Sequence, residues 1–301
     1  MDDLTRSFYW MAFQLAFMEK KGDEFQDFFA SIMEKRYSAD FIRVRPWGNV
    51  GDQKNDGHLK SERVLFQCYA PNELTSARCI AKIDEDFNGA LPHWREHFDT
   101  WVFVHNSKAG LGPEVTAKLL DLDQKHPDLS VTQWGYEELR QRVFSLDEPT
   151  LASLLGPVPS RQSMTELGLA DLAPVLDQIA RLPEVAEPDL RPVPADKLER
   201  NLLSDPVATL LRAGMHRAPL VRKYFAYNPR LQDQIAGSFG AEYQRLRAGS
   251  GTPDDIFMAL QRYAGGASLS APNHQTAVLA CLAFFFEECD IFERPEPPES
   301  T

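Results

Sequence analysis

Three oxygen-bearing side chains lie close together in the sequence between residues 52 and 67. Asp52 and Asp56 stand four positions apart in a stretch rich in Gly and Asn, and Gln67 follows a short apolar run. Carboxylate and amide oxygens are ligands of the hard cation Mg²⁺. An acid at the end of one strand, facing Gln on the neighbouring strand, places two such oxygens within reach of one ion. This spacing indicates a metal site that could support hydrolysis of a phosphodiester.

Such hydrolysis also needs a cation that orients or activates water and offsets the developing charge. Lys82 is the first candidate, because a helix packed on the sheet could aim its amine back at Asp56. Lys54 is the alternative. Asp52 is an alternative metal ligand to Asp56, and Glu24 on an earlier helix could supply a third carboxylate. An Asp-rich Gly loop is also typical of a plain turn, because Asp and Asn bond their own backbone.

Hydrophobic patterning predicts the elements that position these residues. Short apolar runs predict strands at 41–45, 63–69, 100–105 and 130–134. Helical spacing predicts helices before, between and after them, at 5–36, 73–91, 113–123 and 136–143. Gly57 is expected to let the chain turn between the first two strands. This order predicts an α/β fold with a small mixed sheet flanked by helices.

The composition changes after the last of these helices. Two Pro-rich stretches, at 156–160 and 183–194, are typical of linkers. Residues 196–293 have helical spacing and no clear strand. We therefore expect three parts, namely an α/β domain over 1–158, a Pro-rich linker over 159–195 and an all-α partner-docking domain over 196–301.

Charge and hydropathy limit the classes of function. The net charge is −12, whereas a protein that grips nucleic acid unaided is usually basic. Residues 35–63 carry more basic than acidic side chains, and this local excess could face phosphates or form a mixed solvated surface. No stretch approaches the ~20 apolar residues of a membrane helix. The N-terminus lacks the basic segment of an export signal, so we expect a cytoplasmic protein without a membrane partner.

The front half resembles a known nuclease family. The aromatic helix at 25–29, the pair Asp56-Gly57 and the position of Gln67 are similar to the Mrr-type branch of the PD-(D/E)XK nucleases. The resemblance covers roughly residues 20–145. It implies a restriction-endonuclease-like fold, DNA as substrate, Mg²⁺ as cofactor, and Asp56 and Gln67 as metal ligands. Tyr69 stands where that family has its lysine, although some members carry the lysine on another element.

Tyr69 leaves two interpretations open. In the first, the chain is a Mg²⁺-dependent DNA endonuclease in which Lys82 or Lys54 fills the place of the lysine. In the second, the nuclease fold has lost catalysis and serves as a scaffold or sensor. Because the chain is acidic, the first interpretation requires partner subunits to supply much of the grip on DNA.

The C-terminal segment carries a second resemblance. Residues 275–293 form an apolar run with a short acidic end, and they resemble the C-terminal domains of bacterial ABC three-component defence systems. In those systems such a domain accompanies an effector and partners an ABC-type ATPase. The resemblance implies a subunit of an antiphage complex, with an ABC-type ATPase or other defence-system subunits as partners. The sequence also leaves open whether the chain forms a homo-oligomer.

Overall fold

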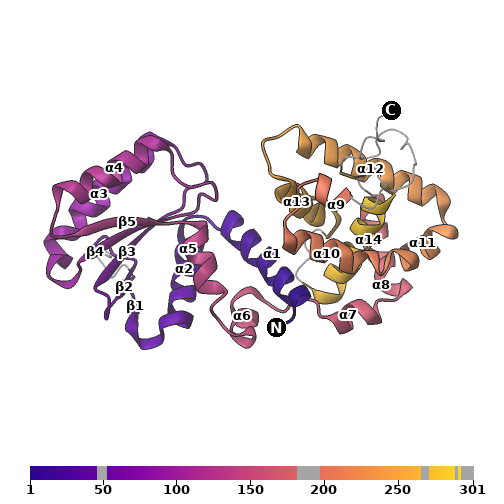
Figure 1. The fold of residues 1–301 in the computed structure, drawn as a ribbon, viewed down its shortest axis with the longest axis horizontal. Helices are drawn as coiled ribbons and strands as arrows, with labels where there is room; N and C mark the ends of the chain where they lie inside the picture. The colour runs from indigo at the N-terminus through magenta and orange to yellow at the C-terminus, as the bar shows by residue number, and fades with distance from the viewer. Residues whose placement is uncertain (46–52, 182–196, 266–270, 289–290, 293–301) are drawn as a thin grey trace, which may run out of the picture. The chain divides into compact units, whose positions relative to one another are not determined.

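The chain forms two compact units, each described here by itself. The computed structural model describes residues 1–45, 53–181, 197–265, 271–288 and 291–292 (Figure 1). One unit, the sheet unit, comprises Phe13–Leu155. The other, the helical unit, comprises Met1–Ala12 together with Gly156–Thr301. The first helix, α1 Asp3–Glu19, contributes residues to both.

A five-stranded mixed sheet forms the centre of the sheet unit, with its strands in the order β1-β2-β3-β4-β5. The strands are β1 Phe41–Arg43, β2 Gly57–Leu59, β3 Val64–Tyr69, β4 Thr100–His105 and β5 Ser130–Trp134. The pairs β1–β2 and β2–β3 are antiparallel, whereas β3–β4 and β4–β5 are parallel. The expected mixed α/β arrangement, followed by a mostly helical region, is confirmed.

Helices cover both faces of this sheet. They are α2 Gly22–Tyr37, α3 Ser76–Trp94, α4 Pro113–Lys125, α5 Tyr136–Val143 and α6 Glu148–Leu155. On one face, Phe87 of α3 packs in a core cluster with Leu65 of β3. On the other, Phe29 of α2 contacts Phe66 of β3, with ring centroids 5.3 Å apart. Because successive strand residues point to opposite faces, both helix layers are anchored on β3 (Figure 1).

Strand β2 differs from the sequence expectation. Gly57 was expected to be a turn residue, but it is the first residue of β2 and pairs with Arg43 and Phe66. A Cβ atom at this position would lie 2.3 Å from Cζ of Phe41, so the glycine makes room for an aromatic ring. A strand of three residues is too short to show a period of two in the sequence, and this explains why it was missed.

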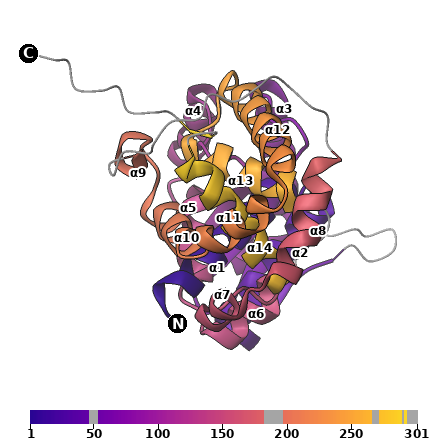
Figure 2. The same cartoon turned by 90° about the vertical axis from the view of Figure 1, so that its right-hand side faces the viewer.

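The helical unit is built around its last helix. Its helices are α7 Arg161–Glu166, α8 Leu169–Ala180, α9 Lys197–Arg200, α10 Asp205–Met215, α11 Ala218–Ala226, α12 Pro229–Arg247, α13 Pro253–Gly265 and α14 Pro272–Glu287. Every residue of α14 from Gln275 to Phe286 is buried, and α14 packs against α8, α10, α11 and α13 (Figure 2). Among the described residues, no helix is both long enough and apolar enough to cross a membrane.

The structure places helices within the range expected to be a linker. Both α7 and α8 fall within 159–195, and α8 buries the apolar side chains Leu172, Val175, Leu176 and Ile179. Residues 182–195 of that range lie outside the described residues. Met1–Ala12, expected in the α/β domain, group with the helical unit instead. Nearby prolines dominate the local composition and conceal the helical spacing of α8.

Candidate metal site and lysine cluster

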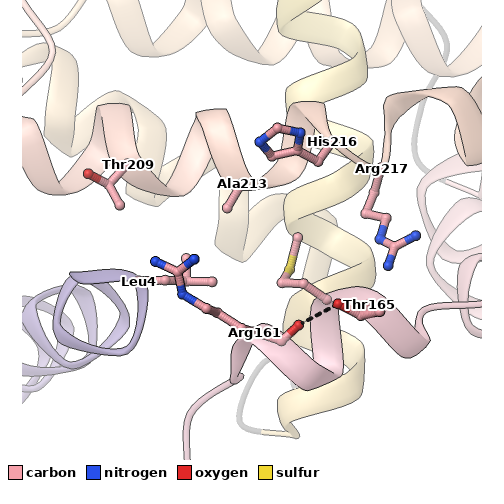
Figure 3. Close-up of a pocket in the computed structure, with 8 residues that line it drawn as sticks. Leu4, Arg161, Thr165, Thr209, Ala213, His216 and Arg217 are labelled. Carbon is pink, nitrogen blue, oxygen red and sulfur yellow. Dashed lines mark hydrogen bonds between the residues drawn. The ribbon is translucent and has the colours of Figure 1, made fainter. Parts of the chain in front are cut away.

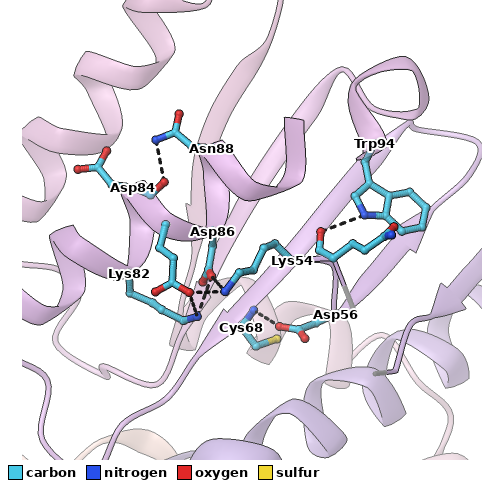
Figure 4. Close-up of polar contacts among 10 residues, drawn as sticks. Lys54, Asp56, Cys68, Lys82, Asp84, Asp86, Asn88 and Trp94 are labelled. Carbon is cyan, nitrogen blue, oxygen red and sulfur yellow. Dashed lines mark hydrogen bonds and ion pairs between the residues drawn. The ribbon is translucent and has the colours of Figure 1, made fainter. Parts of the chain in front are cut away.

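Asp56 lies directly before β2 and is 3% exposed. Its main-chain N–H donates at 2.9 Å to the carbonyl of Phe66, the residue that pairs with Gly57 at the end of the β2–β3 register. Its Oδ2 accepts a hydrogen bond of 2.7 Å from the main-chain N–H of Cys68 (Figure 4). Its Oδ1 accepts one from Nε2 of Gln26 on α2. The Asp56 carboxylate therefore accepts a hydrogen bond from the main chain of β3, as the carbonyl of a neighbouring strand would.

Gln67 is the second predicted ligand, and on β3 it directly precedes Cys68, whose main-chain N–H binds Asp56. Its side chain is 5% exposed, and its Oε1 has no hydrogen-bond partner among the described residues. A buried polar atom without a hydrogen-bond partner costs about 1–3 kcal/mol of stability. Binding of a water molecule or a cation at this oxygen would offset that cost. The metal site formed by Asp56 and Gln67 stays a prediction, and the chemistry of these two oxygen donors fits Mg²⁺.

The two predicted lysines extend from different elements toward one carboxylate, that of Asp86 on α3 (Figure 4). Lys82 Nζ lies 2.7 Å from Asp86 Oδ1, and Lys54 Nζ lies 3.2 Å from the same oxygen. Lys54 also forms an ion pair with Glu85. Its stem crosses Gly89, where a Cβ atom would lie 2.8 Å from Cγ of Lys54. The two lysines therefore share one site, which is organised by an acid that the sequence did not single out.

Asp86 is fully buried, at 0% exposed. Burial raises the pKa of its carboxyl group, while hydrogen bonds and charges from Lys82 and Lys54 act in the opposite direction. The hydrogen bond to Glu85, followed by that to Asp86, raises the pKa of Lys54 despite partial desolvation. Within the described part of the chain, Asp86 Oδ2 has no hydrogen-bond partner. Its position gives a signal in the sequence, because it lies on the face of α3 that buries Cys79, Ile83, Phe87 and Ala90.

The loop that carries Lys54 is held in an uncommon conformation. Gln53 and Lys54 have φ values of 54° and 63°, in the left-handed region that costs a non-glycine residue roughly 1–2 kcal/mol. The indole N–H of Trp94, at the end of α3, donates to the carbonyl of Gln53 at 3.1 Å. This contact ties the loop to the same helix that carries Asp86 (Figure 4).

The remaining predicted residues are placed differently. Glu24 is exposed on α2, and the residue of α2 that reaches Asp56 is Gln26. Asp52 lies outside the described residues. Tyr69 packs against Phe103 with ring centroids 6.0 Å apart. In the described parts of the chain, no three His, Cys, Asp or Glu side chains converge to hold a metal. Other ligands of a bound Mg²⁺ would then be water or substrate oxygens, as is common for this ion.

The comparisons with known proteins bear on the helical unit. Residues 170–293 match the family model for C-terminal domain 10 of the ABC-three component (ABC-3C) systems. The match runs from α8 through α14 and confirms the expected likeness of the C-terminal region to these systems. Comparison with curated proteins gave no match, and comparison with solved structures gave none.

Proposed function

We propose that the chain is a cytoplasmic effector subunit of an ABC-three component antiphage system, and that its sheet unit is a Mg²⁺-dependent DNA endonuclease. The match over residues 170–293 supports the role as a subunit, because these systems have several components. The observation that supports the nuclease activity is the buried Oε1 of Gln67, which has no described partner, beside the N–H of Cys68 that binds the buried Asp56 carboxylate. The mixed sheet with helices on both faces supports a restriction-endonuclease-like fold.

In this proposal Asp56 and Gln67 Oε1 hold the ion, and the lysine cluster handles the substrate. When bound, Mg²⁺ would supply a Lewis acid for the scissile phosphate. The raised pKa of Lys54 keeps its amine protonated at neutral pH. Lys54 therefore acts as a positive charge and a hydrogen-bond donor to developing negative charge on phosphate oxygens, and not as a general base.

The test is cleavage of supercoiled plasmid by the full-length chain, alone and with the other subunits of its system, in Mg²⁺ and in EDTA. Asp56→Asn keeps a side-chain oxygen for the Cys68 N–H but removes the charge. We expect Mg²⁺-dependent cleavage to fall by at least ~100-fold, the scale at which single groups in such sites act. The matched control is Asp121→Asn, at an exposed position on α4. Equal cleavage by the two variants would remove Asp56 from the mechanism.

A second candidate function rests on two specific contacts. The Asp56 carboxylate is already used by the N–H of Cys68 and by Gln26, and Tyr69 packs on Phe103 at the position of the family's lysine. Both contacts favour a nuclease fold without catalysis that serves as a scaffold or sensor. In that case the wild-type chain would cut no DNA with all subunits present, yet its removal would abolish protection against phage.

The helical unit is proposed as the docking domain for an ABC-type ATPase or another subunit. Leu202 and Tyr227 are large apolar side chains that stand 81% and 77% exposed. Stable interfaces bury on the order of 1,600 Å², and Tyr is among the residues that most often dominate their binding energy. Leu202→Ser and Tyr227→Ser should weaken co-purification with the partner, whereas Arg245→Ser, also in this unit, should not. Unchanged co-purification of both apolar variants would place the docking surface elsewhere.

A further inference from the structure

A cavity of about 470 Å³ lies in the helical unit between α7 and α10 (Figure 3). Three of its lining residues are of basic type, namely Arg161, His216 and Arg217, and no lining residue is acidic. Arg161 extends from α7 toward α10, and Arg217 extends from the start of α11 toward α7. The chain as a whole carries a net charge of −12, so this cavity has the opposite electrostatic character to the protein around it.

The positive groups are available to a ligand. Arg161 is 73% exposed, and its nearest acidic partner is Asp2, with Nε 3.7 Å from Oδ2. An exposed pair at that separation contributes little, so an incoming anion can replace it. A guanidinium presents a planar fork of N–H donors that matches phosphate oxygens in pairs. The Arg161 guanidinium lies beside Leu4 and that of Arg217 lies on the other side of the cavity, so each can bind an anion that enters from its side (Figure 3).

The rest of the lining suits the uncharged body of a small ligand. Thr165 and Thr209 supply hydroxyl groups, and the Thr165 hydroxyl donates to the Arg161 carbonyl at 3.0 Å. Leu4, Met164 and Ala213 give an apolar wall. A cavity with mostly apolar walls and a few convergent polar groups, within the ~300–1,000 Å³ of small-molecule sites, is typical of a pocket for one metabolite-sized molecule.

We infer that this cavity binds a phosphate-bearing small molecule of mononucleotide size. The charge selects an anion, a guanidinium group matches the geometry of phosphate oxygens, and the volume suits one small molecule. This binding is independent of the nuclease chemistry proposed for Asp56 and Gln67. It gives the ABC-3C-type domain a ligand in addition to its proposed protein partner.

The test is isothermal titration calorimetry on the full-length chain, with the four nucleoside monophosphates, their four nucleosides and inorganic phosphate as probes. We expect at least one monophosphate to bind with a stoichiometry of one. The matching nucleoside, which lacks the phosphate, should bind at least ~10-fold more weakly, the loss expected for a charge-assisted contact. If the nucleoside binds as tightly as its monophosphate, or if no monophosphate binds, the proposal is overturned. Binding of inorganic phosphate alone would also overturn it, since the apolar wall would then have no role.

Variants locate the binding. Arg161→Ala and Arg217→Ala should each weaken binding by at least ~10-fold, and Arg161 is exposed enough for its removal to spare the fold. Ala213→Phe should fill the cavity and abolish binding without changing its charge. Arg212→Ala, an exposed arginine on α10 outside the lining, is the matched control and should bind as wild type. Binding that survives both arginine substitutions would exclude this cavity as the site.

Discussion

The amine of Lys54 lies 3.2 Å from the carboxylate of Asp86, and this ion pair joins the loop before β2 to the middle of α3. Lys82, one helical turn from Asp86, binds the same oxygen at 2.7 Å. The cations that a phosphodiesterase would need are therefore positioned together by a buried acid. Under the proposed function, Asp86 is a positioning residue, because it acts through the lysines.

The two lysines should differ in their effect on cleavage. Lys54 is two residues from Asp56 and sits in strained left-handed backbone, a feature that clusters at functional sites. We expect Lys54→Met to reduce the single-turnover cleavage rate by ~100-fold or more, and Lys82→Met to reduce it less. If Lys82→Met loses cleavage while Lys54→Met cleaves at the wild-type rate, Lys82 and not Lys54 is the lysine that acts on the phosphate.

Asp56 should also matter for stability, separately from any activity. Asp56→Ala removes the acceptor for the Cys68 N–H and for Gln26 in a buried position. Leaving a buried donor without a partner costs about 1–3 kcal/mol, so the sheet unit should lose stability of that order. Urea unfolding followed by tryptophan fluorescence measures it, because Trp94, Trp101 and Trp134 all lie in that unit. Asp56→Asn should lose much less, and equal losses would contradict a hydrogen-bonding role.

Asp86 should make the stability of the sheet unit depend on pH. Its folded-state pKa is raised above the ordinary 3.8, chiefly by burial. As pH rises through the interval above 3.8, the unfolded state loses its proton first, so stability from this group falls. Relative to wild type, Asp86→Asn should therefore gain unfolding free energy as the pH rises above about 3.8. A change in the opposite direction would mean that the lysines outweigh burial.

Gly57 should tolerate no side chain while Phe41 is present. A Cβ atom would lie 2.3 Å from the Phe41 ring, and overpacking of this kind costs typically about 1–3 kcal/mol. Gly57→Ala should destabilise the sheet unit by that amount in urea unfolding, and Phe41→Leu should recover part of the loss in the double variant. If the losses of unfolding free energy in the two single variants simply add in the double variant, the contact with Phe41 does not explain why position 57 is a glycine.

Much of the fold could be predicted because it follows from repeated apolar spacing. The runs that become β3, β4 and β5, and the amphipathic face of α3, are long enough to show their periods. Strand β2 is too short for this, and α8 lies near prolines. In both cases local composition points away from the element that tertiary packing produces.

The candidate site could be predicted only in part. The burial of Asp56 and Gln67 near the β2–β3 connection agrees with the sequence, whereas their pairing at one metal ion stays a prediction. The partner of Lys54 could not be predicted, because it depends on how α3 packs against the loop before β2. Asp86 gave a usable signal, since an acid on the apolar face of a helix is rarely buried without a cationic partner. Gln26 gave none, since glutamine is common on half-buried helix faces.

The grouping of Met1–Ala12 with Gly156–Thr301 has a consequence for the order in which the protein is made. The sheet unit is one continuous stretch, so all of its residues are available for folding once Leu155 has left the ribosome. The helical unit is different, because its first residues are synthesised before the sheet unit and its buried centre, α14, is synthesised last. Since units fold when their parts are present, the helical unit closes only after α14 has been translated. Capture by another subunit through this unit would accordingly be a late event, reserved for chains that have been translated through α14.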